Sequence, residues 1–426
     1  MNLPKTNKPR IVIIGGGFAG MNLAKNLKSV NAQVVLVDKN NFHTFQPLLY
    51  QVATAGLEPD SVTYPLRKIF NNYDDFYFRV AEAQEVDTER EVLITNRGEI
   101  EYDYLVLSTG AETNFFGNEN VARYSMPMKS ISEALDLRSL ILQNFEEALL
   151  TNDVSEREKF MNLVIVGGGP TGVELAGALA ELKKLVLPKD YPDLDFRRMQ
   201  VHLIEGTSAL LNTMSSNASE GALDFLENMG VQVWLDSMVK DYDGEEVQIG
   251  NKTLPSKTLI WAAGVKGAPP KGIKAGKSGR LTTDEFLMVD GYPNIFSIGD
   301  LASIESEEKP NGHPMLASVA VQQGEHLARN FKLLLSGKAL KPFEYNDKGT
   351  MATVGRNKAV VDLPHYKFQG RMAWYVWMFV HLLLLVGFRN KLVALLNWIW
   401  SYVNYDKGIR LIIRPFKRKQ KRELVK

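Results

Sequence analysis

Residues 10–20 read RIVIIGGGFAG, and this stretch decides the fold class of the chain. Ile11–Ile14 are a short apolar run, which predicts a strand buried on both faces of a parallel sheet. Gly15, Gly17 and Gly20 follow in G-x-G-x-x-G spacing, and MNLAKNLKSV is expected to continue as a helix. Glycines at these places permit a tight turn, a close approach to a pyrophosphate, and helix–strand packing. We therefore expect a pyrophosphate at the helix N-terminus, where free N–H groups favour negative charge.

A second predicted strand, AQVVLVD, ends in Asp38. A carboxylate at this offset from the glycines is typical of one that binds the ribose hydroxyls of an adenine dinucleotide. An isolated glycine motif is a weak signal, but the two strands, the glycine loop, the helix and the terminal acid together are a strong one. The predicted cofactor site also includes Phe18, Ala19 and Lys39.

The same pattern recurs from residue 162. An apolar strand is followed by Gly167, Gly169 and Gly172, then by a helix, and then by a strand that ends in Glu205. Two complete fingerprints predict two bound dinucleotides. Because the Glu205 carboxylate would repel a 2′-phosphate, the second site should prefer NAD to NADP. The remaining predicted members of this site are Pro170, Thr171 and Gly264.

The strands between the fingerprints indicate the domain organisation. A strand that ends at Gly264 parallels an earlier one that ends at Thr109 and Gly110, so the second Rossmann-like domain is expected to be inserted in the first. Thr109 and Gly110 are small residues where the backbone can approach a ligand, and they are predicted to contact the cofactor. A later strand ends in Gly299 and Asp300, which suit a phosphate and a polyol chain, although a simple turn aspartate is the alternative. The predicted fold class is α/β, with two Rossmann-like domains and a C-terminal helical membrane-anchoring segment. The predicted limits are 8–150 and 285–345 for the first dinucleotide-binding domain, 151–284 for the inserted second dinucleotide-binding domain, and 346–426 for the C-terminal region.

Two stretches of the first half have readable local structure. Residues 39–70 are too rich in proline and polar residues for one element, and they either run along the dinucleotide or form a connecting loop plus helix. Alternating runs after residue 76 predict strands, with a hairpin at Asn96-Arg97-Gly98. An amphipathic helix is expected over Ser130–Leu150, with a capping box between Ser130 and Glu133.

Composition excludes several classes of function. The chain has 426 residues, 45% of them hydrophobic, and a net charge of +1, which argues against a nucleic-acid binder. It contains no cysteine, which excludes disulfides, cysteine-ligated clusters and dithiol relays. Its six histidines have no ligand spacing, so no metal is expected. No secretory signal is recognised near the N-terminus, and an intracellular protein is expected.

The C-terminal region is apolar and aromatic. Arg371–Phe388 is apolar on nearly all sides but shorter than the roughly 20 residues of a bilayer span, and its His381 is expected to be packed. Arg389-Asn390-Lys391 is expected to interrupt the run before a second helix over Leu392–Tyr405. A monotopic membrane anchor is favoured, with a single kinked span and a buried homodimer interface as alternatives. The basic residues suited to anionic lipid are Arg410, Arg414, Lys417, Arg418, Lys419, Lys421 and Arg422.

The motifs in combination resemble one family. GGGFAG with Asp38, FHTFQPLLYQVATAGL, STGAETNFFG, GGGPTGVELAGAL, FSIGD and HLLLLVGFRN are similar to the type II NADH:quinone oxidoreductases, the non-pumping NADH dehydrogenases. The resemblance covers nearly the whole chain. It implies a two-dinucleotide flavoprotein with FAD on the first fingerprint and NADH on the second. The further residues that it places against FAD are Gln46, Pro47, Leu48 and Asp300.

Glu174 lies two positions past Gly172, in the first turn of the second Rossmann helix. The helix dipole favours a carboxylate there, and this alone is one interpretation. The resemblance implies another, because members of the family carry a glutamate at this place beside the flavin. Glu174 would then orient NADH, or relay a proton as flavin and quinone exchange electrons.

The stretch from Ala317 to Gln323 reads ASVAVQQ, where family members often carry Ala-Gln-x-Ala-x-Gln-Gln in the quinone pocket. Ser318 replaces the first glutamine and is shorter, although it can still donate a hydrogen bond. The resemblance implies quinone contacts at Ser318, Gln322 and Gln323, with Gln322 in a catalytic role, and cofactor contacts that include Ala317 and Val319. The alternative is a helix N-terminus with surface amides.

The function that the resemblance implies is that of a peripheral enzyme on the cytoplasmic side of the cell membrane. NADH would deliver a hydride to FAD, and two electrons would pass to a membrane quinone without proton pumping. Two alternatives stay open: a flavoprotein reductase of a protein acceptor such as a ferredoxin, and a non-catalytic NADH-sensing membrane scaffold. A sulfide:quinone reductase would need cysteines for its sulfur relay.

Overall fold

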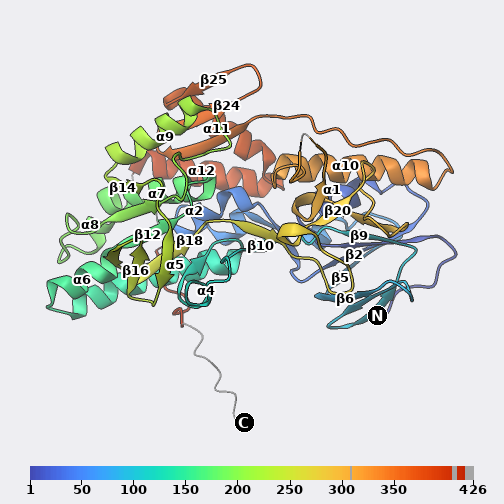
Figure 1. Ribbon diagram of the computed structural model, residues 1–426, viewed down its shortest axis with the longest axis horizontal. Helices are drawn as coiled ribbons and strands as arrows, with labels where there is room; N and C mark the ends of the chain where they lie inside the picture. Colours follow the sequence, from blue (N-terminus) through green and yellow to red (C-terminus); the bar gives the residue numbers. More distant parts are fainter. Residues whose placement is uncertain (308, 405–409, 418–426) are drawn as a thin grey trace, which may run out of the picture. The chain divides into compact units, whose positions relative to one another are not determined.

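The computed structural model describes residues 1–307, 309–404 and 410–417, and the chain divides into two compact units (Figure 1). Each unit contains one five-stranded parallel sheet, which confirms the α/β class with two Rossmann-like sheets. The first unit comprises Met1–Thr44, Thr63–Glu112 and Val265–Lys348, and the second comprises Phe45–Val62, Thr113–Gly264 and Gly349–Lys426. Part of the anchor prediction depends on residues outside the described ranges, namely Tyr405, Arg418, Lys419, Lys421 and Arg422.

In the first unit, β1 (Arg10–Ile14) is the central strand of a sheet with the order β21-β9-β1-β2-β5. Ile11–Ile13 are fully buried, since parallel strands pair with both edges of β1 and both sheet faces are covered. This confirms the strand that the apolar run predicts. The other strands of the sheet are β2 (Gln33–Asp38), β5 (Phe76–Val80), β9 (Tyr104–Leu107) and β21 (Ile295–Ser297).

Helix α1 (Phe18–Asn26) follows the first glycine loop and packs along α10 (Ala317–Leu334) (Figure 1). The two helices approach backbone to backbone, because a side chain on Gly324 of α10 would collide with the carbonyl oxygen of Ala19. Helix α1 ends at Asn26, so the last four residues of the predicted helix, 27–30, lie beyond it.

The rest of the first unit consists of short elements. The predicted hairpin is present, since β7 and β8 are joined through Asn96 and Arg97, and Gly98 follows with a φ of +114°. The remaining elements of this unit are β3 (Phe42–Thr44), β4 (Thr63–Pro65), α3 (Leu66–Ile69), β6 (Ala83–Asp87), β7 (Val92–Thr95), β8 (Gly98–Glu101), β19 (Val265–Gly267), β20 (Leu281–Thr283) and β22 (Ala302–Ile304). Strand β10 (Ala111–Thr113) begins in the first unit and ends in the second.

The second unit repeats the Rossmann-like architecture, with the strand order β11-β18-β12-β13-β14. Its central strand β12 (Leu163–Val166) is buried along its length and leads through the second glycine loop into α7 (Pro170–Glu181). Helix α5 (Ile131–Leu150) carries the predicted capping box, in which Ser130 and Glu133 each accept from the other's backbone N–H. The remaining strands of the sheet are β11 (Met126–Pro127), β13 (Val201–Ile204), β14 (Val231–Trp234) and β18 (Thr258–Trp261).

Other elements of the second unit surround this sheet. An antiparallel sheet of β15, β16 and β17 packs on it through a shared apolar core that includes the fully buried Tyr242. Helix α9 packs against β14. These elements are α2 (Leu49–Ala53), α4 (Glu119–Tyr124), α6 (Val154–Met161), α8 (Leu187–Asp190), α9 (Ser216–Asn228), β15 (Val239–Tyr242), β16 (Glu246–Ile249) and β17 (Lys252–Pro255).

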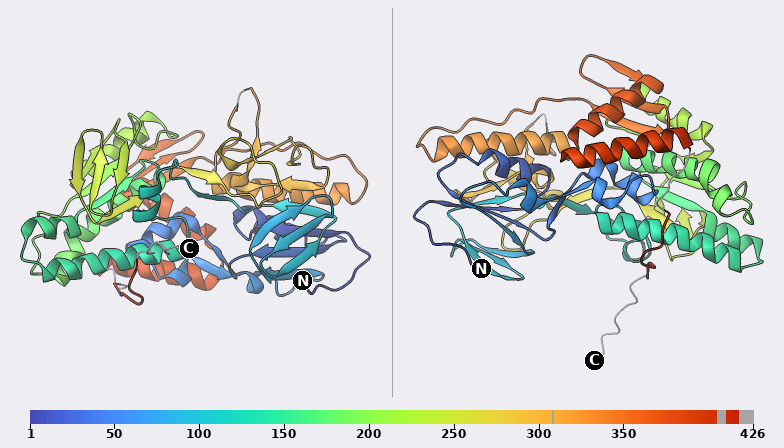
Figure 2. Two further views of the ribbon diagram at one scale, coloured as in Figure 1. Left: turned by 60° about the horizontal axis from the view of Figure 1, so that its bottom comes forward. Right: turned by 180° about the vertical axis from the view of Figure 1, so that it is seen from behind.

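The C-terminal part of the second unit is a three-stranded antiparallel sheet and two helices that lie side by side (Figure 2). Because α12 begins at Phe388, Arg389–Lys391 lie inside its first turn, and the prediction that they interrupt the helices was wrong. The break falls at 385–387, where Gly387 has a φ of +88°. No helix of the described residues is long and apolar enough to cross a membrane. These elements are β23 (Thr350–Gly355), β24 (Lys358–Asp362), β25 (Lys367–Gln369), α11 (Arg371–Leu384) and α12 (Phe388–Asn404).

Candidate functional site

The first glycine loop is shaped by close backbone contacts. Gly15 has a φ of +103°, and a side chain there would collide with the carbonyl of Ser108, at the end of the neighbouring strand β9. A side chain on Gly20 would collide with the carbonyl oxygen of Gly15. Gly17 differs from both, because no neighbouring atom lies within 4 Å of the position that a Cβ atom would occupy there. The protein itself therefore requires the outer two glycines, whereas the middle one leaves room for a ligand.

The second glycine loop has the same construction in the other unit. Gly167 has a φ of +111°, and its missing side chain would meet the backbone of Ala262. A side chain on Gly172 would collide with the carbonyl oxygen of Gly167, whereas Gly169 again borders open space. Pro170 occupies the first turn of α7, where its missing N–H costs no hydrogen bond. The helix N-terminus thus presents free N–H groups beside the open glycine, which suits a pyrophosphate.

Each fingerprint ends in a carboxylate that is hydrogen-bonded to its own glycine loop. Asp38 accepts from the N–H of Gly16 at 2.6 Å and from the N–H of Asn40 at 2.6 Å. Glu205 accepts from the N–H of Gly168 at 2.6 Å, and its other oxygen accepts from Thr207. Since a carboxylate oxygen can accept more than one hydrogen bond, both acids remain able to bind ribose hydroxyls. Burial raises the pKa of Asp38, while these backbone donors oppose the rise.

The remaining residues predicted to bind FAD lie in both units. In the first unit, Thr109 donates to the carbonyl of Ala268 at 2.7 Å, and Gly110 has a φ of +73° beside open space. Phe18 packs edge-on against His43, and Lys39 is exposed. The members assigned to the second unit are Gln46, Pro47 and Leu48, which form a short 3₁₀ helix in which Leu48 is buried.

The residues predicted to contact quinone on α10 have partners within the first unit. Gln323 is 1% exposed, and its side-chain oxygen accepts from the N–H of Gly299 at 2.7 Å, so it holds the turn that carries Asp300. Ser318 lies 2.9 Å from the hydroxyl of Tyr345. Gln322 exchanges two hydrogen bonds with the backbone of Asn346. These hydrogen bonds give the three residues a structural role in the first unit. Their contacts with quinone stay a prediction.

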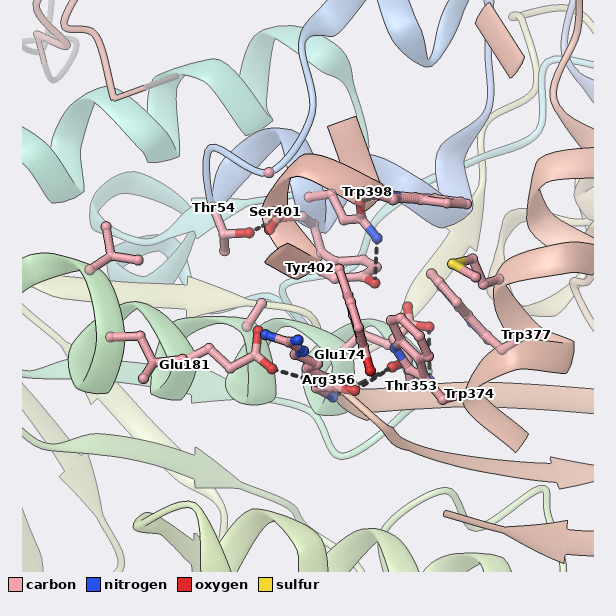
Figure 3. A pocket seen from close by; sticks show the side chains of 18 residues that line it. Thr54, Glu174, Glu181, Thr353, Arg356, Trp374, Trp377, Trp398, Ser401 and Tyr402 are labelled. Carbon is pink, nitrogen blue, oxygen red and sulfur yellow. Dashed lines mark hydrogen bonds between the residues drawn. The ribbon is translucent and has the colours of Figure 1, made fainter. Parts of the chain in front are cut away.

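A cavity of ≈120 Å³ lies in the second unit and is lined from several elements (Figure 3). Glu174 of α7 borders it, and so does Thr353 of β23. Aromatic side chains form much of its wall: Trp374 and Trp377 come from α11, and Trp398 comes from α12. The prediction that Glu174 lies in the first turn of its helix was wrong, because α7 begins at Pro170 and its first turn contains no acidic residue. The sequence also did not connect Glu174 to the C-terminal helices.

Glu174 is 7% exposed, and burial raises its pKa to about 8. The N–H of Thr353 donates to the Glu174 carboxylate at 3.4 Å. This hydrogen bond and the nearby Trp377 indole both oppose the rise in the pKa of Glu174. The Trp377 N–H itself is buried and makes no hydrogen bond of ordinary geometry. Glu174 is therefore mostly protonated at neutral pH, which suits a group that gives up a proton inside a cavity.

His381 is packed, as expected of a lone histidine in an apolar run. Its ring stacks on Trp377 at 4.2 Å, and its Nδ1 lies 2.8 Å from the Trp377 carbonyl oxygen. Burial lowers the pKa of His381 to about 4, so the ring is neutral at physiological pH. Among the described residues, no group of histidine and acidic side chains is arranged to hold a metal ion.

Comparison with known proteins assigns the chain to a family. Residues 9–324 match the family described as pyridine nucleotide-disulphide oxidoreductase, and residues 348–404 match the NDH2 C-terminal domain. The Mycobacterium tuberculosis protein Ndh, a type II NADH:quinone oxidoreductase, is 33% identical over 418 residues, which cover 94% of this chain and 89% of that protein. The chain belongs to the type II NADH:quinone oxidoreductase family.

Further members of the type II NADH:quinone oxidoreductase family agree in sequence or in fold. The M. tuberculosis NdhA is 34% identical over 420 residues, covering 94% of this chain and 88% of that protein. A structure of Plasmodium falciparum NDH2 in complex with NADH has a TM-score of 0.87 at 24% identity, covering 96% of this chain and all of that chain, and shows the shared fold. FAD and NADH are typical of this family, and the two open glycine positions with their terminal acids fit them.

Tyr50 and the three cavity tryptophans are residues that sequence reasoning missed as site members. Tyr50 lies in the FQPLLYQVATAGL stretch, which contributes to the family resemblance but gives this residue no role. Trp398 suits a membrane interface by its sequence context, whereas Trp374 and Trp377 have no predicted role beyond the apolar run that contains them. A signal was available for Trp377, because it lies four residues before His381 and so on the same helix face.

Proposed function

We propose that this chain is a peripheral membrane enzyme that oxidises NADH and reduces a quinone, with FAD as the intermediate carrier. The observation that carries the proposal is Glu174, a buried carboxyl in the second turn of the helix that follows a nucleotide loop, which also borders an aromatic-lined cavity. One residue is thus adjacent both to the predicted nicotinamide nucleotide and to a space that suits an aromatic ring. Membership of the family supports the reaction.

The residues of the two fingerprints bind and orient the cofactors. The second loop would hold NADH, with the N-terminus of α7 binding its pyrophosphate and Glu205 binding its adenosine ribose. The first loop would hold FAD, and Asp38 would bind its adenosine ribose. When bound, FAD accepts a hydride and passes on electrons in pairs, which is chemistry that no side chain of this cysteine-free chain supplies.

The quinone ring lies in the cavity beside Glu174, between aromatic side chains of α11 and α12. Reduction of a quinone to a quinol by NADH consumes the hydride of NADH, which carries two electrons and one proton, and one further proton. Because its pKa is about 8, Glu174 holds a proton at neutral pH that it can give to a quinone oxygen. The N–H of Thr353 fixes the carboxylate at the cavity edge. The quinone contacts of Ser318 and Gln322, on α10 of the first unit, stay predictions.

Helices α11 and α12 form the membrane-binding surface. Phe388 is 82% exposed and Val403 is 66% exposed, and large apolar side chains are rarely this exposed together in a soluble protein. Insertion of this surface would bring the cavity-lining helices to the lipid phase in which quinones dissolve. The exposed apolar residues of the two helices are Met372, Phe379, Leu383, Leu384, Phe388, Leu392, Leu396, Ile399, Trp400 and Val403.

The basic tail contributes less charge to this surface than its composition suggests. Arg414 pairs with Asp136 of α5 at 2.9 Å, and Arg410 pairs with Asp190 of α8. These two charges are therefore partly neutralised within the protein. Lys417 is exposed and keeps its predicted role toward anionic lipid. The cytoplasmic side of attachment, the homodimer and the domain limits stay predictions.

An anaerobic titration of the flavin absorbance tests the reaction. NADH should bleach the flavin of the purified protein rapidly, NADPH should bleach it weakly, and a soluble quinone should restore the colour. Bound flavin that NADH does not bleach would contradict the assignment of the second loop. Bleaching without recovery by any quinone would favour a protein acceptor such as a ferredoxin, and a complete lack of turnover would favour the scaffold alternative.

A further inference from the structure

Three side chains beside the cavity form a hydrogen-bonded chain with a fixed direction. The indole N–H of Trp398, on α12, donates to the side-chain oxygen of Gln51 at 2.8 Å. The amide nitrogen of Gln51 donates to the hydroxyl oxygen of Tyr50 at 2.9 Å. Tyr50 and Gln51 belong to α2, and all three residues line the cavity that Glu174 borders.

The direction of this chain follows from the chemistry of its first member. An indole nitrogen can only donate, so the Gln51 atom that faces Trp398 must be the oxygen. The amide nitrogen of Gln51 then faces Tyr50, and it too can only donate. The Tyr50 oxygen is therefore an acceptor in this contact, and its proton must point elsewhere. Among the described residues, only Gln51 is hydrogen-bonded to the Tyr50 hydroxyl.

We infer that Tyr50 directs its hydroxyl proton into the cavity and binds a carbonyl oxygen of the quinone there, with Gln51 and Trp398 as the positioning residues that set this direction. The inference rests on the proposed function, since it assigns a contact within the proposed quinone site. The ligand group that Tyr50 would bind is an uncharged oxygen on a planar ring, which accepts a hydrogen bond. Electron acceptors that do not enter the cavity would not depend on Tyr50.

The surroundings of Tyr50 keep it a donor. The residue is 5% exposed, and burial, together with the nearby Glu174 carboxylate, raises its pKa well above the ordinary value. Tyr50 therefore stays protonated at any physiological pH. A quinone has two carbonyl oxygens on opposite sides of its ring. Tyr50 would hold one of them by a hydrogen bond.

The positioning residues connect this contact to the C-terminal helices. Without the indole N–H of Trp398, the Gln51 amide could turn and offer its oxygen to Tyr50. The Tyr50 proton would then be used within the protein and not by the substrate. Docking of α12 thus decides whether the site has a donor for the quinone oxygen.

Steady-state kinetics with two electron acceptors test the inference. Purified flavin-loaded enzyme is assayed with saturating NADH and either a short-chain 1,4-benzoquinone or ferricyanide, which takes electrons without entering an apolar cavity. In Tyr50→Phe the quinone KM should rise about three- to tenfold, as expected for one uncharged hydrogen bond. The ferricyanide rate should be unchanged. Tyr191→Phe is the matched control, because Tyr191 is a buried, hydrogen-bonded tyrosine of the same unit that does not line the cavity, and its quinone KM should be unchanged.

A second variant separates direction from the mere presence of the hydroxyl. In Gln51→Glu, the ionised carboxylate still accepts a hydrogen bond from the Trp398 indole. Because it has no proton to donate, it must also accept the hydrogen bond from the Tyr50 hydroxyl. The Tyr50 proton then turns away from the cavity, so the quinone KM should rise by a similar factor although the hydroxyl is retained. The double variant Tyr50→Phe/Gln51→Glu should be no worse than either single one.

The outcomes distinguish this inference from the function on which it depends. A wild-type enzyme that reduces ferricyanide but no quinone overturns both. A wild type that reduces quinone, together with an unchanged quinone KM in Tyr50→Phe or in Gln51→Glu, overturns the inference and leaves the function standing. Equal losses with quinone and with ferricyanide would show a structural role, which also overturns it.

Discussion

Oε2 of Glu205 accepts a hydrogen bond of 2.6 Å from the backbone N–H of Gly168, so the acid that ends the second fingerprint is fixed to the loop that begins it. Asp38 and Gly16 have the same relationship at the same distance in the other unit. The carboxylate thereby keeps one position relative to the pyrophosphate loop, and a ribose bound to that loop meets a fixed negative charge.

Removal of this charge should change nucleotide preference. In Glu205→Gln, the ratio of kcat/KM for NADH to that for NADPH should fall roughly tenfold or more, because a 2′-phosphate no longer faces a carboxylate. Stopped-flow reduction of the flavin by each nucleotide measures this ratio. Asp38→Gln, which alters the acid of the first fingerprint, should leave the ratio unchanged in any enzyme that still holds FAD. An equal loss with both nucleotides in Glu205→Gln would contradict the assignment.

Substitution of an outer glycine of the second loop should lower protein stability, whereas substitution of the middle glycine should weaken NADH binding. Gly172→Ala should destabilise the protein by about 2 kcal/mol or more, since the added methyl group collides with the carbonyl of Gly167. Gly169→Ala should melt at the wild-type temperature but bind NADH poorly, because its methyl group enters the open space at the helix N-terminus. Thermal melting and NADH titration of both variants check this contrast. Similar melting temperatures for the two variants would refute it.

Stability should depend on pH through Glu174. Burial raises its pKa from 4.5 to about 8, so between these values the folded protein binds a proton that the unfolded chain releases. This group therefore stabilises the fold fully below pH 4.5, and its contribution is lost as pH rises toward 8, by at most about 1.4 kcal/mol per pH unit. Glu174→Gln should consequently gain stability relative to wild type as pH rises through this window. Melting temperatures of the two flavin-loaded proteins from pH 5 to 9 measure the difference, and a constant difference would contradict the buried protonated carboxyl.

Membrane binding should depend on the exposed apolar residues of α11 and α12. The triple variant Leu383→Ser/Leu396→Ser/Ile399→Ser should bind vesicles of mixed neutral and anionic lipid at least about tenfold more weakly, since each leucine or isoleucine contributes about 1.5–3 kcal/mol when fully buried. Cosedimentation with vesicles measures this loss. Leu150→Ser on α5 is the control, because Leu150 is 80% exposed but lies outside these helices. Undiminished binding by the triple variant would assign attachment to another surface.

The local elements of this chain were predictable from its residues because short-range physics determines them. An apolar run that is followed by a glycine loop and a helix, such as Ile11–Ile14, predicts a buried strand of a parallel sheet. Gly15 and Gly167 were readable because only glycine adopts their φ values without strain. The boundary of α1 and the break before α12 were mispredicted, since helix ends depend on capping and turn contacts that composition does not reveal.

Contacts between distant segments could not be predicted in the same way. The sequence by itself determined two nucleotide loops, their terminal acids and a glutamate at the start of the second helix, because each lies within a few dozen residues of its motif. Only the tertiary structure decided that Glu174, Tyr50 and Trp398 border one cavity, since these residues lie on three separate helices of the second unit. It also decided that Gln323 holds the Gly299 turn. Side-chain direction and hydrogen-bond partners of this kind follow from packing, and packing depends on the whole fold and not on any one stretch of sequence.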